Sequence, residues 1–144
     1  MSGENLFKYQ KVQNAAARLV LGRRRRDSAR SALQELHWLC VDARINFKIL
    51  LLVYKVVRGI CSENLNLQYK SFNGRPCEYL MLDTPVFKSK YGQRLFAYSG
   101  PRLWNALPVA MWMEEDIDQY KKSLKTLLFN GNDELKQRAF KYRK

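Results

Sequence analysis

Val41-Asp-Ala-Arg-Ile-Asn-Phe-Lys-Ile-Leu-Leu-Leu-Val-Tyr-Lys55 is the stretch that decides the fold. In a helix built from these residues, apolar side chains occupy nearly every face, and Gly59 follows where such a helix would end. A helix that is apolar nearly all round lies in a core. The sequence therefore predicts a buried helix from about Asp42 to Arg58, at the centre of a mainly α-helical fold.

One strip of this helix is basic instead of apolar. At 3.6 residues per turn, its four cations fall within roughly 80° of one another; they are Arg44, Lys48, Lys55 and Arg58. The strip has two interpretations. It is a track facing phosphates, or its side chains simply extend to water from a core helix, and the second is the commoner outcome.

The residues before this helix predict two more. Apolar side chains fall on one face of a first helix from about Glu4 to Leu21, which stops near Gly22. A basic linker of four arginines, Arg23 to Arg26, follows it. Asp27 or Ser28 caps the next helix, whose inward side chains are Leu33, Leu36 and Trp38. The apolar face of the first helix consists of Leu6, Tyr9, Val12, Ala16, Leu19 and Val20.

The residues after the central helix are less regular. Weak periodicity over residues 60–78 predicts a long loop. Tyr79–Leu82 and Leu95–Tyr98 are apolar and aromatic, which predicts a small antiparallel β-hairpin. Pro101 is suited to the first position of a short helix that Pro108 ends.

A last helix is predicted from its N-terminal cap. Asp116 with Gln119 has the spacing of a capping box. The helix after it ends at Asn130-Gly-Asn-Asp133, because Asn and Gly favour turns. We therefore expect about five helices and an inserted hairpin in one domain over residues 1–130, and a basic tail or short helix over 131–144. The expected core consists of Leu36, Trp38, Ile45, Ile49, Leu52, Val53, Trp104, Leu124 and Leu127.

The charge of the chain predicts a polyanionic partner. The formal net charge is +13, and each third of the chain has a positive balance, so the charge is not held in one tail. Distributed Lys and Arg attract nucleic acid. The three cysteines are an odd number, which argues against a disulfide framework and favours a reducing intracellular compartment, nuclear or cytoplasmic. The longest apolar run, from Ile49 to Tyr54, is too short to cross a membrane, so no membrane partner is expected.

Several stretches carry a resemblance to a known family. Together they span roughly residues 8 to 130 and resemble, in order, the region after the polymerase core of non-LTR (LINE-type) retrotransposon reverse transcriptases, closest to the jockey-like and chicken-repeat clades. Such regions are thought to help hold template RNA or target DNA beside the polymerase. The matching stretches are Gln13–Val20, Ser31–Leu39, Val41–Lys55, Gly100–Pro108 and Lys121–Phe129.

The resemblance implies a transposable-element origin without the chemistry of the family. Polymerisation needs carboxylates that hold two metal ions, and this sequence has no Asp-Asp pair and one histidine. We predict no catalytic residue, cofactor or metal. His37, Cys40, Cys61 and Cys77 are the candidate zinc ligands, but their spacings match no compact zinc site, and relatives usually have proline at position 40.

The first hypothesis is therefore a non-catalytic module that binds RNA or DNA through phosphates. The alternatives are a structural or protein-interaction remnant that packed on the polymerase thumb, which would self-associate or bind a protein, and a transposon-derived reading frame without a selected function. The residues expected to contact nucleic acid are Arg23, Arg24, Arg25, Arg26, Arg30, Arg44, Lys48, Lys88, Lys90, Lys121, Lys122 and Lys125.

Overall fold

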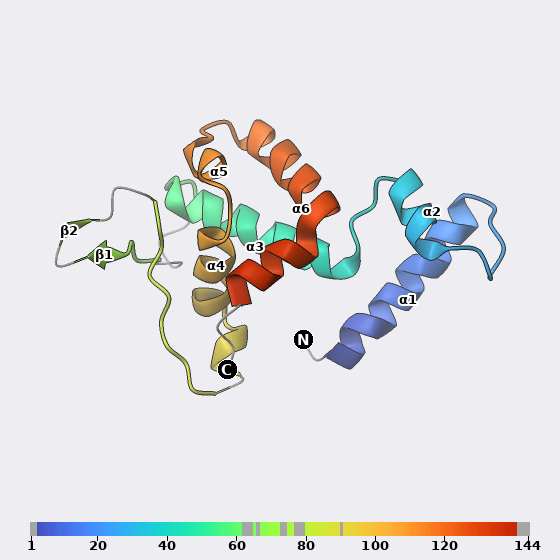
Figure 1. The fold of residues 1–144 in the computed structure, drawn as a ribbon, viewed down its shortest axis with the longest axis horizontal. Helices are drawn as coiled ribbons and strands as arrows, with labels where there is room; N and C mark the ends of the chain where they lie inside the picture. Colours follow the sequence, from blue (N-terminus) through green and yellow to red (C-terminus); the bar gives the residue numbers. More distant parts are fainter. Residues whose placement is uncertain are drawn as a thin grey trace. The chain divides into compact units, whose positions relative to one another are not determined.

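The computed structural model describes residues 3–61, 65, 67–72, 75, 76, 80–89 and 91–140. The described chain is mainly helical, as predicted, and is divided into two compact units, Met1–Ile45 and Asn46–Lys144 (Figure 1). The prediction of one domain over residues 1–130 stays a prediction. None of the helices in the described ranges has the length and hydropathy of a bilayer span.

The first unit pairs two helices. Helix α1 (Gly3–Val20) packs on α2 (Ala29–Glu35), and helix α3 (Val41–Val57) begins in this unit. Ala17, Ala32 and Leu33 are buried between α1 and α2. Small alanine side chains allow the two backbones to approach closely, so this unit is held by a small core. Leu21, Leu36 and Trp38 are half-buried against it.

Only part of the apolar face predicted for α1 packs, since Leu6 and Ala16 are half-buried and its other four side chains are exposed. Tyr9, Val12, Leu19 and Val20 are 55%, 69%, 82% and 61% exposed. Ala17 lies at the contact with α2 instead, because the small side chain permits the closest approach. We call the exposed set of Tyr9, Val12, Leu19 and Val20 the α1 stripe.

Two glutamines of α1 hold the start of α3. The Gln13 side chain donates to the carbonyl oxygen of Leu39 at 2.8 Å, and the Gln10 side-chain oxygen accepts from the Val41 N–H at 2.9 Å. Val41 is the first residue of α3, where backbone N–H groups lack partners within the helix. These side chains therefore fix the chain between α2 and α3.

Helix α2 ends at a residue in the left-handed region. His37 has φ 51°, and its N–H donates to the carbonyl of Gln34 at 3.0 Å. The next N–H, of Trp38, donates to the carbonyl of Leu33 at 2.9 Å. This pair of hydrogen bonds is the Schellman ending, in which glycine is the preferred residue.

We expect His37→Gly to stabilise the protein by about 0.5–1 kcal/mol, because glycine adopts φ 51° without the Cβ clash. Thermal and urea unfolding followed by circular dichroism measure the change. Gly22→Ala is the matched reverse change. Gly22 has φ 62° and open space around an added Cβ, so a fall of about 1 kcal/mol in the free energy of unfolding would come from the backbone alone. A destabilising His37→Gly would contradict this account.

The second unit surrounds one face of α3. Helices α4 (Phe96–Asn105), α5 (Val109–Met113) and α6 (Ile117–Phe140) complete it, with a short 3-10 turn, η1 (Gly92–Arg94), before α4 (Figure 1). Leu50, Val53 and Tyr54 of α3 are buried. The Tyr54 and Tyr120 rings stack with centroids 4.1 Å apart. Aromatic stacking and apolar burial together therefore hold this unit.

Burial of the predicted core is partial. Val53, Trp104 and Leu124 are fully buried, as predicted. The others are only half-buried: Leu36, Trp38, Ile45, Ile49, Leu52 and Leu127. Of the α3 residues only Arg44 and Lys48, on the predicted basic strip, are exposed, and all the others are buried or half-buried, so the helix is enclosed on most of its surface.

The hairpin predicted from Tyr79–Leu82 and Leu95–Tyr98 is not seen. Phe96 begins α4, so the second expected strand is helical. Leu82 instead exchanges two hydrogen bonds with the side chain of Asn105, its N–H donating at 2.9 Å and its carbonyl accepting at 2.8 Å. A side chain of α4 has taken the place of a partner strand. Tyr79 lies outside the described residues.

Strand pairing occurs on a smaller scale elsewhere. Strands β1 (Ser71–Phe72) and β2 (Arg75–Pro76) pair antiparallel, with Ser71 opposite Pro76 and Phe72 opposite Arg75. An isolated bridge joins Tyr69 to Leu82. Two-residue strands contribute few backbone hydrogen bonds, so we place no functional residue on them.

Proline and glycine act differently from the prediction in the last helices. Pro101 lies inside α4, not at its first position, and Pro108 is the N-cap of α5. At Gly100 an added Cβ would lie 3.0 Å from Val53 Cγ2, so the missing side chain lets α4 approach α3.

Helix α6 does not end at Asn130 but continues across a kink at Gly131 (φ −141°, ψ 30°).

Candidate nucleic-acid interface

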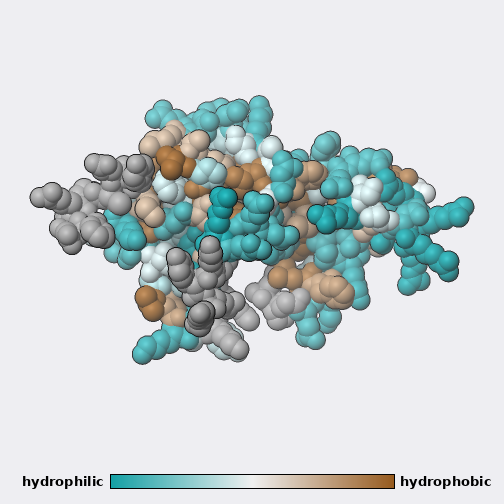
Figure 2. All heavy atoms as spheres, viewed as in Figure 1, coloured by the Kyte–Doolittle hydropathy of each residue, from teal (hydrophilic) through white to brown (hydrophobic). Residues whose placement is uncertain are grey.

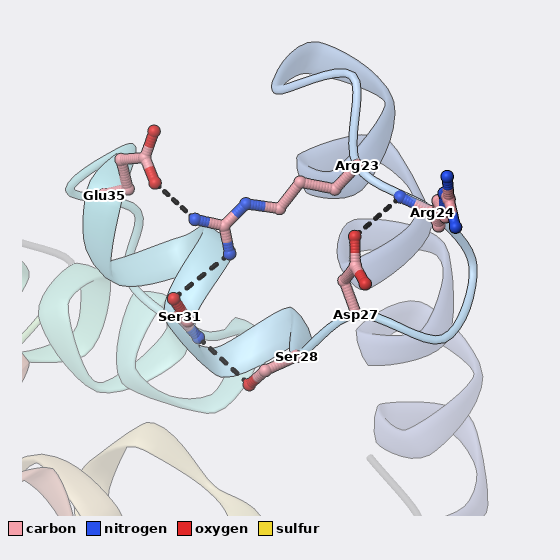
Figure 3. Close-up of polar contacts among 6 residues, drawn as sticks. All are labelled: Arg23, Arg24, Asp27, Ser28, Ser31 and Glu35. Atoms are coloured by element: carbon pink, nitrogen blue, oxygen red, sulfur yellow. Dashed lines mark hydrogen bonds and ion pairs between the residues drawn. The ribbon is translucent and has the colours of Figure 1, made fainter.

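The arginine loop, residues 23–26, is held in place by Asp27. The Arg24 N–H donates to the Asp27 carboxylate at 2.8 Å, and the Asp27 N–H donates to the Arg24 carbonyl at 3.0 Å (Figure 3). Arg18 of α1 adds a third contact, because its Nε donates to the Asp27 carbonyl at 2.8 Å. A turn closed by its own backbone and tied to α1 presents its side chains from a defined position.

Arg23 differs from the other arginines of the loop because its side chain already contacts α2. Its guanidinium donates to Ser31 Oγ at 3.1 Å and forms an ion pair with Glu35, both on α2. Figure 3 shows the side chain extended across to that helix, whereas the Arg24 side chain points away from it. Arg23 was predicted to contact nucleic acid; its guanidinium already contacts α2 in this structure, and that role stays a prediction. The Arg23 side chain therefore connects the arginine loop to α2.

The remaining arginines of this region face solvent. Arg24, Arg25, Arg26 and Arg30 are exposed, and within the described part of the chain none of them takes part in an ion pair. Residues 23–30 contain five arginines and one aspartate, which gives a local charge of +4. Figure 2 shows hydrophilic side chains over the end of the unit that carries this loop. We call Arg24, Arg25, Arg26 and Arg30 the arginine cluster.

The basic strip predicted on α3 does not form one open track. Arg44 and Lys48 are exposed, but Lys55 and Arg58 are half-buried. Arg44 is also engaged locally, since its Nε donates to the Leu39 carbonyl at 3.2 Å and its guanidinium lies 5.9 Å from the Trp38 ring centroid. Only Arg44 and Lys48 of the strip are therefore accessible to a ligand, and Arg44 already contacts Leu39 and Trp38.

Arg58 is a structural residue of the second unit. Its Nη2 donates to the carbonyl oxygens of Trp112 at 3.0 Å and Glu114 at 2.7 Å, and its guanidinium lies 5.6 Å from the Tyr54 ring centroid. These carbonyls lie at the C-terminal end of α5 (Val109–Met113), where a positive charge is favourable. Arg58 therefore joins α3 to the end of α5.

The predicted lysines of the second unit are only partly free. Lys88, Lys122 and Lys125 are exposed. Lys121 pairs with Asp118 at 2.9 Å. That hydrogen bond and the lysine charge hold the pKa of the Asp118 carboxyl below its usual value, so the pair is present at neutral pH and is lost as the pH falls through this lowered pKa. Lys90 lies outside the described residues.

The acidic run before α6 caps that helix. The Asp116 carboxylate accepts from the N–H groups of Asp118 at 3.1 Å and Gln119 at 3.3 Å. Glu114 Oε1 accepts from the Asp116 N–H at 3.2 Å. The N-terminal cap predicted at Asp116 is confirmed. These carboxylates therefore already accept hydrogen bonds from the backbone at a helix start.

The candidate zinc ligands are only partly described. Cys40 and Cys61 are half-buried free cysteines, and His37 ends α2. Cys77 lies outside the described residues. Over the ranges that the structure describes, no three His, Cys, Asp or Glu residues come together as metal ligands.

A groove of about 870 Å³ runs between α5 and α6. Glu114, Lys122 and Glu134 contribute to its lining, together with apolar side chains such as Met111 and Leu127. Two carboxylates and one lysine make the groove unsuitable for a phosphate chain, because like charges repel. The groove is therefore not part of the candidate interface.

Sequence reasoning missed the residues that position the cluster. Arg18 and Glu35 both lie in helices, and their contacts with the loop join residues nine and twelve positions apart. Helical spacing relates residues three or four apart, so it gives no signal for these contacts. No protein-family model, curated protein or solved structure matches the chain.

Proposed function

We propose that this protein is a non-catalytic module that binds nucleic acid non-specifically through its phosphate backbone. The observation that carries the proposal is the arginine cluster, four exposed guanidinium groups on or beside a turn that Asp27 closes. Guanidinium groups pair with phosphate oxygens through two parallel hydrogen bonds. Such contacts fix a protein on the backbone without reading the bases.

The other exposed cations extend the proposed interface. Within the first unit, Arg44 adds one charge. Within the second unit, Lys48, Lys88, Lys122 and Lys125 are the exposed lysines that the sequence singled out. Each unit therefore contributes cations of its own, and the arginine cluster is the densest group among them.

We also propose that the chain derives from the region after the polymerase core of a LINE-type retroelement. The support is the ordered resemblance of its sequence blocks, from Gln13–Val20 to Lys121–Phe129. The proposal explains why a strongly basic chain would lack the paired aspartates of a polymerase. An upstream genomic reading frame encoding that aspartate pair would support this origin.

Salt-dependent binding of single strands tests the function. Fluorescence anisotropy of labelled RNA and DNA of the same length is measured at about 50 mM and about 200 mM salt. With four to six phosphate contacts on a single strand, we expect affinity to fall by roughly 50- to 350-fold between these concentrations. RNA and DNA should differ little. Undetectable binding at low salt, or binding indifferent to salt, would show that phosphate contacts are absent.

Glu35 provides a test in the opposite direction. We expect Glu35→Gln to release Arg23 from its ion pair, which adds one available guanidinium to the cluster. Affinity for single strands at low salt should rise several-fold, and the slope of log affinity against log salt should steepen by up to about 0.7. The free energy of unfolding should change by less than about 1 kcal/mol, because the pair is exposed. An unchanged slope would mean that Arg23 stays bound to α2.

A second candidate function is protein interaction or self-association, favoured by the α1 stripe. The four large apolar side chains of this stripe lie exposed along one helix, where Phe7 is exposed as well, and clustered apolar residues on a surface mark interaction sites. Size-exclusion chromatography with light scattering compares the natural chain with Val12→Lys/Leu19→Lys. If both proteins are monomers, this candidate is contradicted. If the natural chain is an oligomer and the double variant is a monomer, it is supported.

A further inference from the structure

Ser28 combines exposure with an arginine-rich approach. It follows Arg24-Arg-Arg-Asp27, and of all serines and threonines in the sequence it alone has arginines both two and three positions before it. Its side chain is exposed. The hydroxyl oxygen accepts from the Ser31 N–H at 3.4 Å, a long contact that leaves other directions of the oxygen open. Ser28 therefore presents a nucleophilic hydroxyl next to the arginine cluster.

The local backbone suits an enzyme that binds its substrate in an extended form. Ser28 has φ −61° and ψ 117°, which is extended. The turn before it is closed by two hydrogen bonds between the exposed residues Arg24 and Asp27, and by a third exposed hydrogen bond from Arg18 Nε to the Asp27 carbonyl. Exposed contacts of this kind open at low cost, so residues 24–28 can leave the turn without disturbing the buried Ala17 and Leu33.

We infer that Ser28 is a phosphorylation site for an arginine-directed serine/threonine protein kinase. Acidic residues in the cleft of such a kinase would pair with the guanidinium groups of Arg25 and Arg26. A bond forms between Ser28 Oγ and the γ-phosphorus of ATP, while the bond from that phosphorus to the β,γ-bridging oxygen breaks. ADP leaves, and the hydroxyl proton passes through a base of the kinase to solvent.

Phosphorylation at this place would switch off the arginine cluster. A phosphoserine carries a charge of about −1.5 to −2 near pH 7, so the local charge of +4 over residues 23–30 would fall to about +2. The phosphate oxygens would also compete for the guanidinium groups that the proposed function gives to nucleic acid. This step rests on the proposed function, whereas the modification itself does not.

Ser31 is an internal comparison within the same helix start. It is exposed, but Ser28 and Ala29 stand where a kinase of this class would bind arginines. Its hydroxyl already accepts from Arg23 at 3.1 Å. We therefore expect phosphate at Ser28 and none at Ser31.

The first experiment incubates the full chain with a purified arginine-directed kinase and MgATP. Mass spectrometry of the intact chain and of its fragments counts and locates the phosphate. We expect one phosphate on Ser28. Ser28→Asn keeps an N-cap residue, so it should fold and remain unmodified, and Ser31→Ala should be modified normally. Arg25→Gln/Arg26→Gln should slow the reaction at least tenfold.

Three results would overturn the site. The first is phosphate on another residue, the second is equal incorporation into Ser28→Asn, and the third is an unmodified full chain when a peptide of residues 22–31 is modified. The last result would mean that the folded chain withholds Ser28. Circular dichroism of each variant confirms that the comparison is made between folded proteins.

The second experiment measures the consequence. Anisotropy with the same single-stranded RNA compares the phosphorylated and unmodified chains at two salt concentrations. We expect affinity to fall at least roughly tenfold and the salt slope to become shallower by about 1–2. Equal binding of both forms would overturn the switch. If the unmodified chain itself fails to bind, the proposed function fails, while the modification site is judged by the first experiment alone.

Discussion

Trp104→Ala lowers the free energy of unfolding of the second unit by about 3–5 kcal/mol, the largest stability effect that we expect in this chain. The indole is fully buried and lies 6.4 Å from the Tyr120 ring, centroid to centroid. Its Nε1 donates to the Leu80 carbonyl at 2.7 Å. Alanine would leave a cavity and would also leave that carbonyl oxygen without its donor.

Urea unfolding followed by circular dichroism at helical wavelengths measures the loss. Val86→Ala is the control, because Val86 is 91% exposed and its removal should cost less than about 0.5 kcal/mol. A cost below about 1 kcal/mol for Trp104→Ala would show that the indole is not at the centre of this unit. The buried stack of Tyr54 on Tyr120 would then have to carry its stability.

The largest functional effect should come from Arg24→Gln/Arg25→Gln/Arg26→Gln. This triple variant removes three exposed guanidinium groups and leaves Arg23 paired with Glu35. If each of the three contacts one phosphate of the single strand, the slope of log affinity against log salt becomes shallower by about 2.1, and the affinity in about 0.1 M salt falls by roughly two orders of magnitude. Anisotropy titrations with a single-stranded RNA at several salt concentrations measure both quantities.

The matched control is Lys121→Gln/Lys122→Gln/Lys125→Gln, which removes the same formal charge from α6. Lys121 is already paired with Asp118, so fewer available charges are lost and the effect should be smaller. Equal losses for the two triple variants would mean that binding follows net charge alone. The arginine cluster would then have no special part in it.

The helices of the first half were predictable because their ends are marked locally. Gly22 and Gly59 adopt φ 62° and 67°, the left-handed values that glycine allows at a helix end. Ser28 is the N-cap of α2, one of the two residues predicted for that place. These signals lie within a few residues of the feature that they determine, so the sequence alone carries them.

The predictions that were wrong share a different cause. The hairpin prediction was wrong because Leu82 bonds to Asn105, twenty-three residues away. The contact of Arg23 with α2 was missed, since Arg23 looks identical to its three neighbours in the sequence, yet only its side chain meets Glu35. Tertiary contacts decided both cases, and neither periodicity nor composition reports such contacts. How much of the predicted apolar face of α1 packs was misjudged for the same reason.

The exposed α1 stripe has a practical consequence for handling the protein. High salt is needed to release bound polynucleotide from the protein. The same salt screens the electrostatic repulsion between chains of net charge +13. Exposed valine and leucine side chains then meet with less electrostatic opposition, and sulfate would strengthen their attraction further. We therefore expect turbidity to appear during high-salt purification. A chloride wash at moderate concentration, followed by rapid dilution, is the gentler route to a nucleic-acid-free sample.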